Sequence, residues 1–296
     1  MSNGDILRPK SGSPLTRVVY TPTTGLRHPI DLVRGITHDV FSPQSRSLAW
    51  RLFIRNMSAQ FRQSLLGYFW LFFPPLLNSA VFIFLNSRQI IKIADTGVPY
   101  PVFVLTGNLL WQCLIMLLQA PIQSVHRERG LLTKLNFSRE ALLVSSFLEG
   151  GAMAFIPLAA VPLILIVFHI PFSLTMLLAP IGILGLCFFA FAIGVILTPI
   201  GTLYQDVGRA IPVIARFWMF VTPVIYALPA PGKTRTLLML NPATPLLETA
   251  RDWMLGRPAD LASLFGLYFG ISVIALFIGV LVYRLAMPII VERMSA

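Results

Sequence analysis

Residues 150–205 read GGAMAFIPLAAVPLILIVFHIPFSLTMLLAPIGILGLCFFAFAIGVILTPIGTLYQ, and these 56 residues contain no Asp, Glu, Lys or Arg. A helix needs about 20 apolar residues to cross the hydrocarbon core of a bilayer. The stretch is therefore too long for one crossing, and it predicts two. The break between them is expected at His169, Pro171 and Ser173, and the first of the two helices is expected to begin near Ala141.

Four further apolar tracts have the length of a membrane span. In chain order, the predicted spans one, two, five and six are residues 63–87, 102–126, 211–229 and 261–283. Between spans five and six, the proline-rich segment 228–260 carries too much apolar surface for a free loop. We therefore predict an all-α integral membrane protein with six transmembrane helices and with short outer re-entrant helices between spans five and six.

The composition excludes an ordinary soluble domain. Of 296 residues, 56% are hydrophobic and 12% are charged, against about a quarter charged in average proteins. The net charge of +11 does not indicate nucleic-acid binding, because the basic residues punctuate apolar runs instead of gathering on one solvated face. Segments expected inside hold 17 Lys and Arg and those expected outside hold 6, which predicts that both termini are cytoplasmic.

The chain divides into a polar tail (1–45), a six-span domain (46–290) and a cytoplasmic carboxy-terminal tail (291–296). At the start of the domain, apolar residues recur at helical spacing, and a narrow stripe of arginines lies beside them. This pattern predicts an amphipathic interface helix whose arginines face lipid phosphate, although a packed cytosolic helix with a basic face fits as well. The apolar residues are Trp50, Phe53, Ile54, Met57, Phe61 and Leu65, and the arginines are Arg51, Arg55 and Arg62.

No catalytic constellation is recognisable in the sequence. We predict no catalytic, cofactor-binding or metal-binding residues, and the chain is not expected to be an enzyme. Gly232, Lys233 and Thr234 resemble the end of a phosphate-binding loop, but the first glycine of that motif is missing. The intramembrane charges are Glu149 and Arg216. By depth, the partner of Glu149 is expected to be Arg216 or Arg209, in either a structural pair or a proton or substrate site.

Five short motifs occur in a characteristic order. They are FRQSLLG at 61–67 followed by Trp70, Pro74 and Pro75; LTGNLLW at 105–111; LTKLNFSRE at 132–140; TPVIY at 222–226; and Asn241-Pro242 followed by Arg251. In this order, over roughly residues 46–290, the chain resembles the membrane permease of ABC exporters for polysaccharides and polyol phosphates, such as O-antigen, capsule and teichoic acid. Two positions depart from the family pattern: Ser138 replaces the usual proline, and Gln205 stands where an arginine commonly precedes the aspartate.

The resemblance implies a homodimer in the bacterial cytoplasmic (inner) membrane, working with two copies of a separate ABC ATPase subunit that binds ATP and Mg²⁺. The cargo would be a lipid-linked polysaccharide or polyol phosphate. Charged residues in the inner loops are expected to dock on the ATPase, arginines of the interface helix to contact lipid headgroups or pyrophosphate, and aromatic residues of spans one and five to line the glycan conduit. In that order, these residues are Arg127, Glu128, Arg129, Asp206 and Arg209; Arg51, Arg55 and Arg62; and Trp70, Phe73 and Tyr226.

Three other interpretations remain open at this point. The first is a drug, lipid or antibiotic exporter permease of the same superfamily, which would have a narrower and drier conduit. The second is a membrane-embedded transferase, which would need acidic metal-binding pairs near the inner interface. The third is an ion-coupled carrier that uses Glu149.

Overall fold

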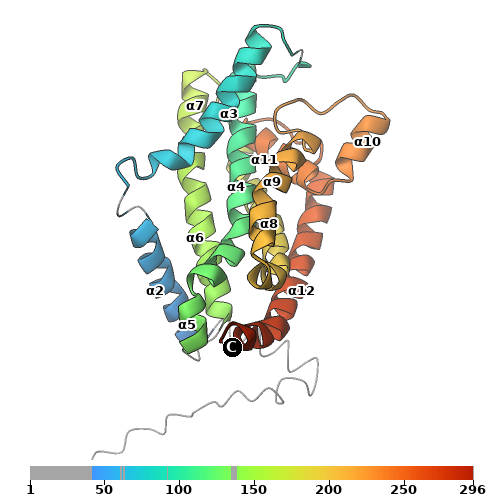
Figure 1. The fold of residues 1–296 in the computed structure, drawn as a ribbon. Helices are drawn as coiled ribbons and strands as arrows, with labels where there is room; N and C mark the ends of the chain where they lie inside the picture. Colours follow the sequence, from blue (N-terminus) through green and yellow to red (C-terminus); the bar gives the residue numbers. More distant parts are fainter. Residues whose placement is uncertain (1–41, 61, 63, 92, 135–138, 296) are drawn as a thin grey trace, which may run out of the picture. The chain divides into compact units, whose positions relative to one another are not determined.

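The structure is a computed structural model. It describes residues 42–60, 62, 64–91, 93–134 and 139–295. Most of the predicted polar tail lies outside the described residues, as do Phe61, Gln63 and residues 135–138 of the motifs. Over the described residues the chain forms helices joined by turns, without a β-strand, so the predicted all-α class is confirmed (Figure 1).

Five stretches of the described chain are long and apolar enough to cross a membrane. They are α3 (Phe69–Ser87), α4 (Tyr100–Arg127), α6 and α7 (Glu140–Leu158 and Val161–Val167), η1 and α8 (Leu174–Leu178 and Ala179–Leu203), and α12 (Ala262–Ser295). The predicted break in the uncharged 56-residue stretch is confirmed, because the chain turns between α7 and η1 at His169, whose φ is 54°. The α12 helix continues beyond the predicted end of span six, and its last part turns aside toward the carboxy terminus (Figure 1). Pro288 lies inside this helix, where a proline is expected to cause a kink.

The helix in the region of predicted span five is α9 (Gln205–Val221), which lies earlier in the chain than the predicted 211–229. It ends at Val221 because Pro223 disfavours a helical conformation at Thr222, which is extended with φ −106° and ψ 136°. With 17 residues, α9 is about 26 Å long, slightly shorter than the hydrocarbon core. The structure thus supports a multi-span helical protein, and the sixth crossing depends on α9.

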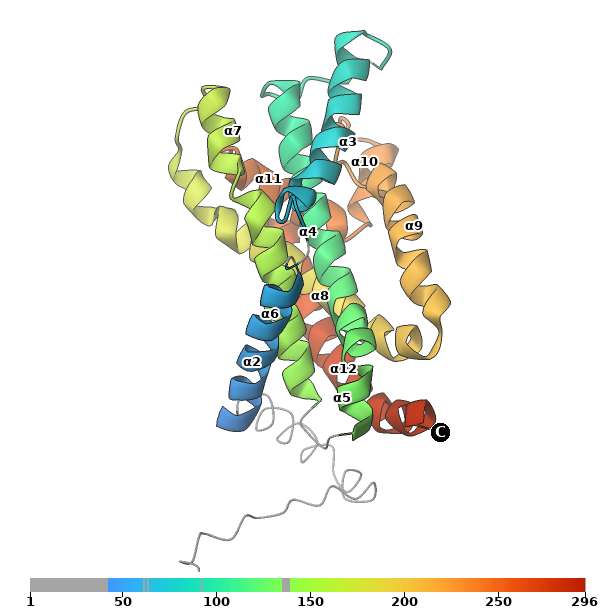
Figure 2. The same cartoon turned by 60° about the vertical axis from the view of Figure 1, so that its left-hand side comes forward.

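The core of the bundle is built around α4, most of whose side chains are buried. The α4 helix packs against α6 and α8, and α8 in turn packs against α12 (Figures 1 and 2). Small residues allow this close approach: at Gly194 of α8, an added Cβ would overlap the carbonyl oxygen of Leu118 in α4. By contrast, α3 buries only Pro75 and Ser79, so most of its apolar side chains are exposed on the described chain.

The predicted amino-terminal helix is present as α2 (Pro43–Gln60). It lies alongside the first half of α6 and runs in the same direction as that helix (Figures 1 and 2). Its packed face consists of Ser45, Ala49, Leu52 and Asn56. On the described chain Trp50 and Ile54 of the predicted apolar stripe are exposed, 54% and 47%, which leaves that face available to lipid, as an interface helix requires. Two small side chains on the packed face, Ser45 and Ala49, let α2 approach α6 closely.

Three short helices complete the fold: α5 (Arg129–Lys134), α10 (Lys233–Met239) and α11 (Ala243–Met254). The α10 and α11 helices lie in the segment where short helices were predicted. The α11 helix is almost wholly buried among α4, α8 and α12.

Candidate functional site

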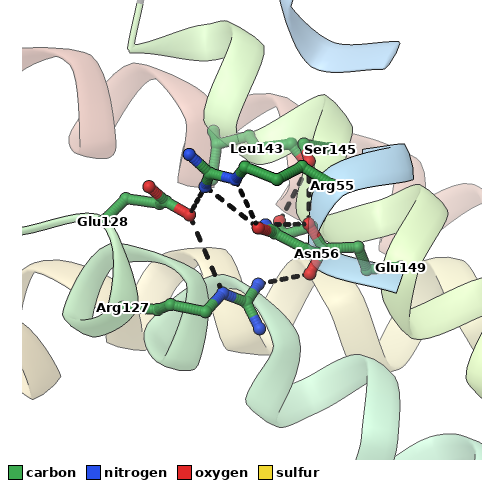
Figure 3. Close-up of polar contacts among 8 residues, drawn as sticks. Arg55, Asn56, Arg127, Glu128, Leu143, Ser145 and Glu149 are labelled. Carbon is green, nitrogen blue, oxygen red and sulfur yellow. Dashed lines mark hydrogen bonds and ion pairs between the residues drawn. The ribbon is translucent and has the colours of Figure 1, made fainter. Parts of the chain in front are cut away.

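Charged and polar side chains meet where α2, the end of α4 and the first half of α6 come together (Figure 3). We call this group the ionic cluster. Its members are Arg55 and Asn56 from α2, Arg127 and Glu128 from the end of α4, and Ser145 and Glu149 from α6. It contains two arginines and two glutamates, so its formal charge is zero.

Glu149 has a partner for each of its carboxylate oxygens. The Oε1 atom accepts hydrogen bonds from Asn56 Nδ2 at 2.7 Å and from Ser145 Oγ at 2.8 Å. The Oε2 atom forms an ion pair with the Arg127 guanidinium. The partner expected from the sequence, Arg216 or Arg209, is therefore wrong: both belong to α9, whereas Glu149 is paired with the end of α4.

Glu128 forms the second ion pair, with Arg55, and its Oε1 atom also lies 3.8 Å from Nε of Arg127. The Asn56 side chain joins the two pairs, because its Oδ1 atom accepts hydrogen bonds from Arg55 at 2.9 and 3.1 Å while its amide nitrogen donates to Glu149. Three helices, of which α2 is distant in sequence from the other two, are thus connected through four charged groups.

Burial makes these contacts energetically important. The side chains of Glu128 and Glu149 are 6% and 8% exposed, whereas those of Arg55 and Arg127 are 52% and 41% exposed. Removing one partner of a buried ion pair leaves an uncompensated charge and costs about 3–5 kcal/mol. A groove of about 170 Å³ opens beside the cluster, lined by Arg127, Glu149 and several polar and apolar neighbours. Those neighbours are Gln60, Leu71, Met116, Gln119, Ala120, Gln123, Gly150 and Met153.

The residues predicted to dock on the ATPase occupy two places. Arg127 and Glu128 belong to the ionic cluster, and Arg129, the first residue of α5, is exposed beside it. Asp206 and Arg209 lie in the first turns of α9, 3.6 Å apart, with side chains 92% and 77% exposed.

The three arginines predicted to contact headgroups differ in their surroundings. Arg55 is held by Glu128, whereas Arg51 and Arg62 are exposed. The sequence did not reveal Asn56 or Ser145 as members of the site. Ser145 stands four residues before Glu149 and hence on the same helix face, a spacing that could have indicated it. No pattern in the sequence pointed to Asn56.

The predicted conduit residues do not form one group in the described chain. Trp70 and Phe73, in the first turns of α3, are 52% and 38% exposed, and their rings lie edge to face with centroids 5.6 Å apart. Tyr226 follows the end of α9 and donates a hydrogen bond to the Phe220 carbonyl oxygen at 3.1 Å.

Several motif residues converge instead around α11. Arg251 is fully buried, stacks on the Phe103 ring at 3.6 Å, donates to the Val224 carbonyl oxygen at 3.1 Å and pairs with Glu248. An added Cβ at Gly107 would overlap the same carbonyl oxygen. Nearby, Asn241 accepts a hydrogen bond from Trp218 at 3.1 Å and donates to Thr222 at 2.8 Å. These motifs thus hold the turn after α9 against α4 and α11.

Comparisons with known proteins give the chain a context. No family model matches it. An O-antigen export system permease protein, RfbA, of Myxococcus xanthus is 26% identical over 219 residues, covering 70% of this chain and 79% of the relative. A protein of the same name from Klebsiella pneumoniae is 21% identical over 217 residues, covering 73% of this chain and 83% of the relative. The chain is thus similar over about 70% of its length to two O-antigen export system permease proteins, in agreement with the resemblance that its ordered motifs carry.

Proposed function

We propose that this chain is the transmembrane subunit of an ATP-driven exporter that moves a lipid-linked polysaccharide or polyol phosphate across the cytoplasmic membrane. The similarity to two O-antigen export permeases over about 70% of the chain carries the proposal. Two copies of the chain would form the membrane part, and two copies of a separate ATPase would bind ATP and Mg²⁺. The chain itself would bind no cofactor.

The ionic cluster supports a route by which force enters the membrane part. Arg127 and Glu128 stand where α4 ends and α5 begins, and Arg129 is exposed at the same junction. An ATPase that docks there would pull on α4 directly. Because Glu128 and Arg127 also pair with Arg55 and Glu149, the same displacement would reach α2 and α6. Asp206 and Arg209 offer a second exposed charged contact at the start of α9.

The proposed topology has six crossings, with α9 as the fifth and both termini in the cytoplasm. The apolar length of the other five stretches supports their crossing of a membrane, and the excess of Lys and Arg in the inner segments supports the orientation. The α10 and α11 helices would then be short re-entrant helices at the outer leaflet. In this arrangement the exposed Arg51 and Arg62 would contact lipid headgroups or pyrophosphate, and the exposed rings of Trp70 and Phe73 would offer stacking faces to sugars.

Affinity purification tests the assignment. The tagged chain is extracted in mild detergent from cells that express it from its own locus, and the co-purifying proteins are quantified. We expect an ATPase subunit at equal stoichiometry, and we expect deletion of the chain to remove a surface glycan while its lipid-linked precursor accumulates inside. A chain that purifies alone and transports without added nucleotide would contradict the proposal, as would an unchanged surface glycan after deletion.

A further inference from the structure

Arg216 is an arginine in the body of α9, eleven residues after its first residue and five before its last. At 1.5 Å per residue, these offsets correspond to about 16 Å and about 7 Å along the helix axis. The residue is exposed on the described chain. A charged side chain inside a membrane span is costly unless it faces a water-filled path or an opposite charge, so Arg216 needs an explanation.

The described carboxylates do not provide its counter-ion. Six of them already pair with other arginines: Glu128 with Arg55, Glu149 with Arg127, Glu140 with Arg284, Asp206 with Arg209, Glu248 with Arg251, and Asp252 with Arg257. The remaining three, Asp95, Asp260 and Glu292, lie in loops or near the end of α12. Among these carboxylates, that of Glu149 lies deepest within a membrane span. It is buried, and both of its oxygens already have partners.

A second copy of the chain would not change this result. In a two-fold dimer whose copies cross the membrane in the same orientation, each residue of one copy lies at the same depth as its equivalent in the other. The described part of the second copy therefore brings the same carboxylates at the same depths. None of the carboxylates that the structure describes, in either copy, is therefore placed to neutralise Arg216, and its guanidinium is available to an anion from another molecule.

The helix face that carries Arg216 is open in the described chain. The α9 helix packs through Ile211, Ala215 and Met219, which recur every fourth residue. Arg216 lies about 100° around the helix from Ala215, and Arg209, two turns earlier, lies about 20° from Arg216 on the same side. Arg209 has its own carboxylate partner, Asp206, at 3.6 Å, whereas Arg216 stands seven residues deeper.

We propose that Arg216 is an anion-binding residue on the transport path, and that its ligand is the phosphate group that joins the exported glycan to its lipid carrier. The inference rests on the proposed function. A guanidinium is the side chain best suited to this role, because its planar fork donates two parallel hydrogen bonds to phosphate oxygens and stays charged at every physiological pH.

A binding assay tests the site directly. The complex of the chain with its ATPase is purified in neutral detergent and titrated with a long-chain prenyl diphosphate, with the matching prenyl alcohol, and with phosphatidylglycerol. We expect Arg216→Gln to weaken diphosphate binding by about 10-fold or more and Arg216→Lys to weaken it less, since a charge-assisted bidentate contact is lost. Alcohol binding should not change. Arg88→Gln, which removes an exposed arginine after the end of α3, is the matched control and should bind as the wild type does.

Several results would overturn the site. Equal diphosphate binding by wild type and Arg216→Gln would do so, as would a wild-type protein that binds diphosphate and alcohol alike. If phosphatidylglycerol competes with the prenyl diphosphate at equal affinity, Arg216 binds lipid headgroups in general and not the carrier phosphate. Loss of the dimer in Arg216→Gln would assign it to a contact between subunits. If Arg216→Gln does not fold, Arg216→Lys decides the question, because it keeps the charge but loses the bidentate contact; diphosphate binding equal to that of the wild type would then overturn the site.

An export assay in cells separates this inference from the proposed function. If the wild-type gene restores no surface glycan to a deletion strain, the proposed function fails. If the wild type restores the glycan and Arg216→Gln restores it equally well, only the role of Arg216 fails. We expect restoration by the wild type and by Arg88→Gln, and at least a tenfold lower rate of surface appearance with Arg216→Gln, in line with the binding loss.

Discussion

The pairing of Arg127 with Glu149 allows a quantitative test of the ionic cluster. Arg127→Gln removes the cation that faces a carboxylate whose side chain is only 8% exposed. An uncompensated buried charge costs about 3–5 kcal/mol, and the lower end applies because Asn56 and Ser145 still donate to Glu149. Arg127→Gln should therefore destabilise the protein by about 3 kcal/mol. In the double variant with Glu149→Gln the buried charge is gone, and about 2 kcal/mol of that loss should be recovered.

The assay is thermal unfolding of the purified protein in one detergent, with the wild type, both single variants and the double variant measured side by side. For a chain of this length, 3 kcal/mol corresponds to a drop in Tm of roughly 5–10 °C. Lys233→Gln, which removes an exposed cation at the start of α10, is the control and should leave the Tm within about 1 °C. A double variant whose loss equals the sum of the two single losses would refute the reasoning, because it would show that the two side chains are not coupled.

Three further predictions follow from other parts of the molecule. Gly107→Ala should destabilise the protein by several kcal/mol because the new methyl group would overlap a backbone carbonyl oxygen, whereas Gly266→Ala, in open space, should be neutral by the same Tm measurement. Burial, followed by the nearby Glu248, raises the pKa of Asp252 from 3.8 to about 6, so the ionisation of Asp252 destabilises the fold as the pH rises from about 4 to about 6. Asp252→Asn should therefore stabilise the protein at pH 8 by up to about 3 kcal/mol, which a higher Tm would show, and it should change the Tm little at pH 4. Replacing both Trp70 and Phe73 with alanine should lower glycan export severalfold with an unchanged Tm, because both side chains are exposed; unchanged export would remove their role in the conduit.

The sequence predicts the fold well where the signal is the absence of charge. Long uncharged tracts located five apolar stretches and the break at His169, because the cost of burying a charge in lipid does not depend on tertiary detail. The extent of α9 was missed, although Pro223 carried the information about its end. The sequence analysis made no prediction for the packed face of α2, because this face mixes small, apolar and polar side chains and has no periodic signal.

The candidate site was harder to predict because its members come from three separate helices. Glu149 was recognisable from its depth alone, but its partner was not, since several arginines have similar depths in the sequence. Which of them pairs with Glu149 is decided by the packing of α4 against α6, a tertiary contact that the sequence pattern does not encode. Asn56 illustrates the same limit: an amide on a helix face has meaning only once its neighbours are known.

The burial of Arg251 gives the two ends of the bundle different mechanical properties. The ion pairs of Arg55 and Arg127 have one half-exposed partner each, so water reaches this end of the bundle and can solvate the arginine when a contact breaks. Arg251 has no such substitute, because its side chain is wholly enclosed by an aromatic ring, a carbonyl oxygen and a carboxylate. In the proposed exporter, a movement driven by the ATPase would therefore bend the end of the bundle that holds the ionic cluster. The segments around Arg251 would move together as one rigid unit, and an exit would have to open beside this unit rather than through it.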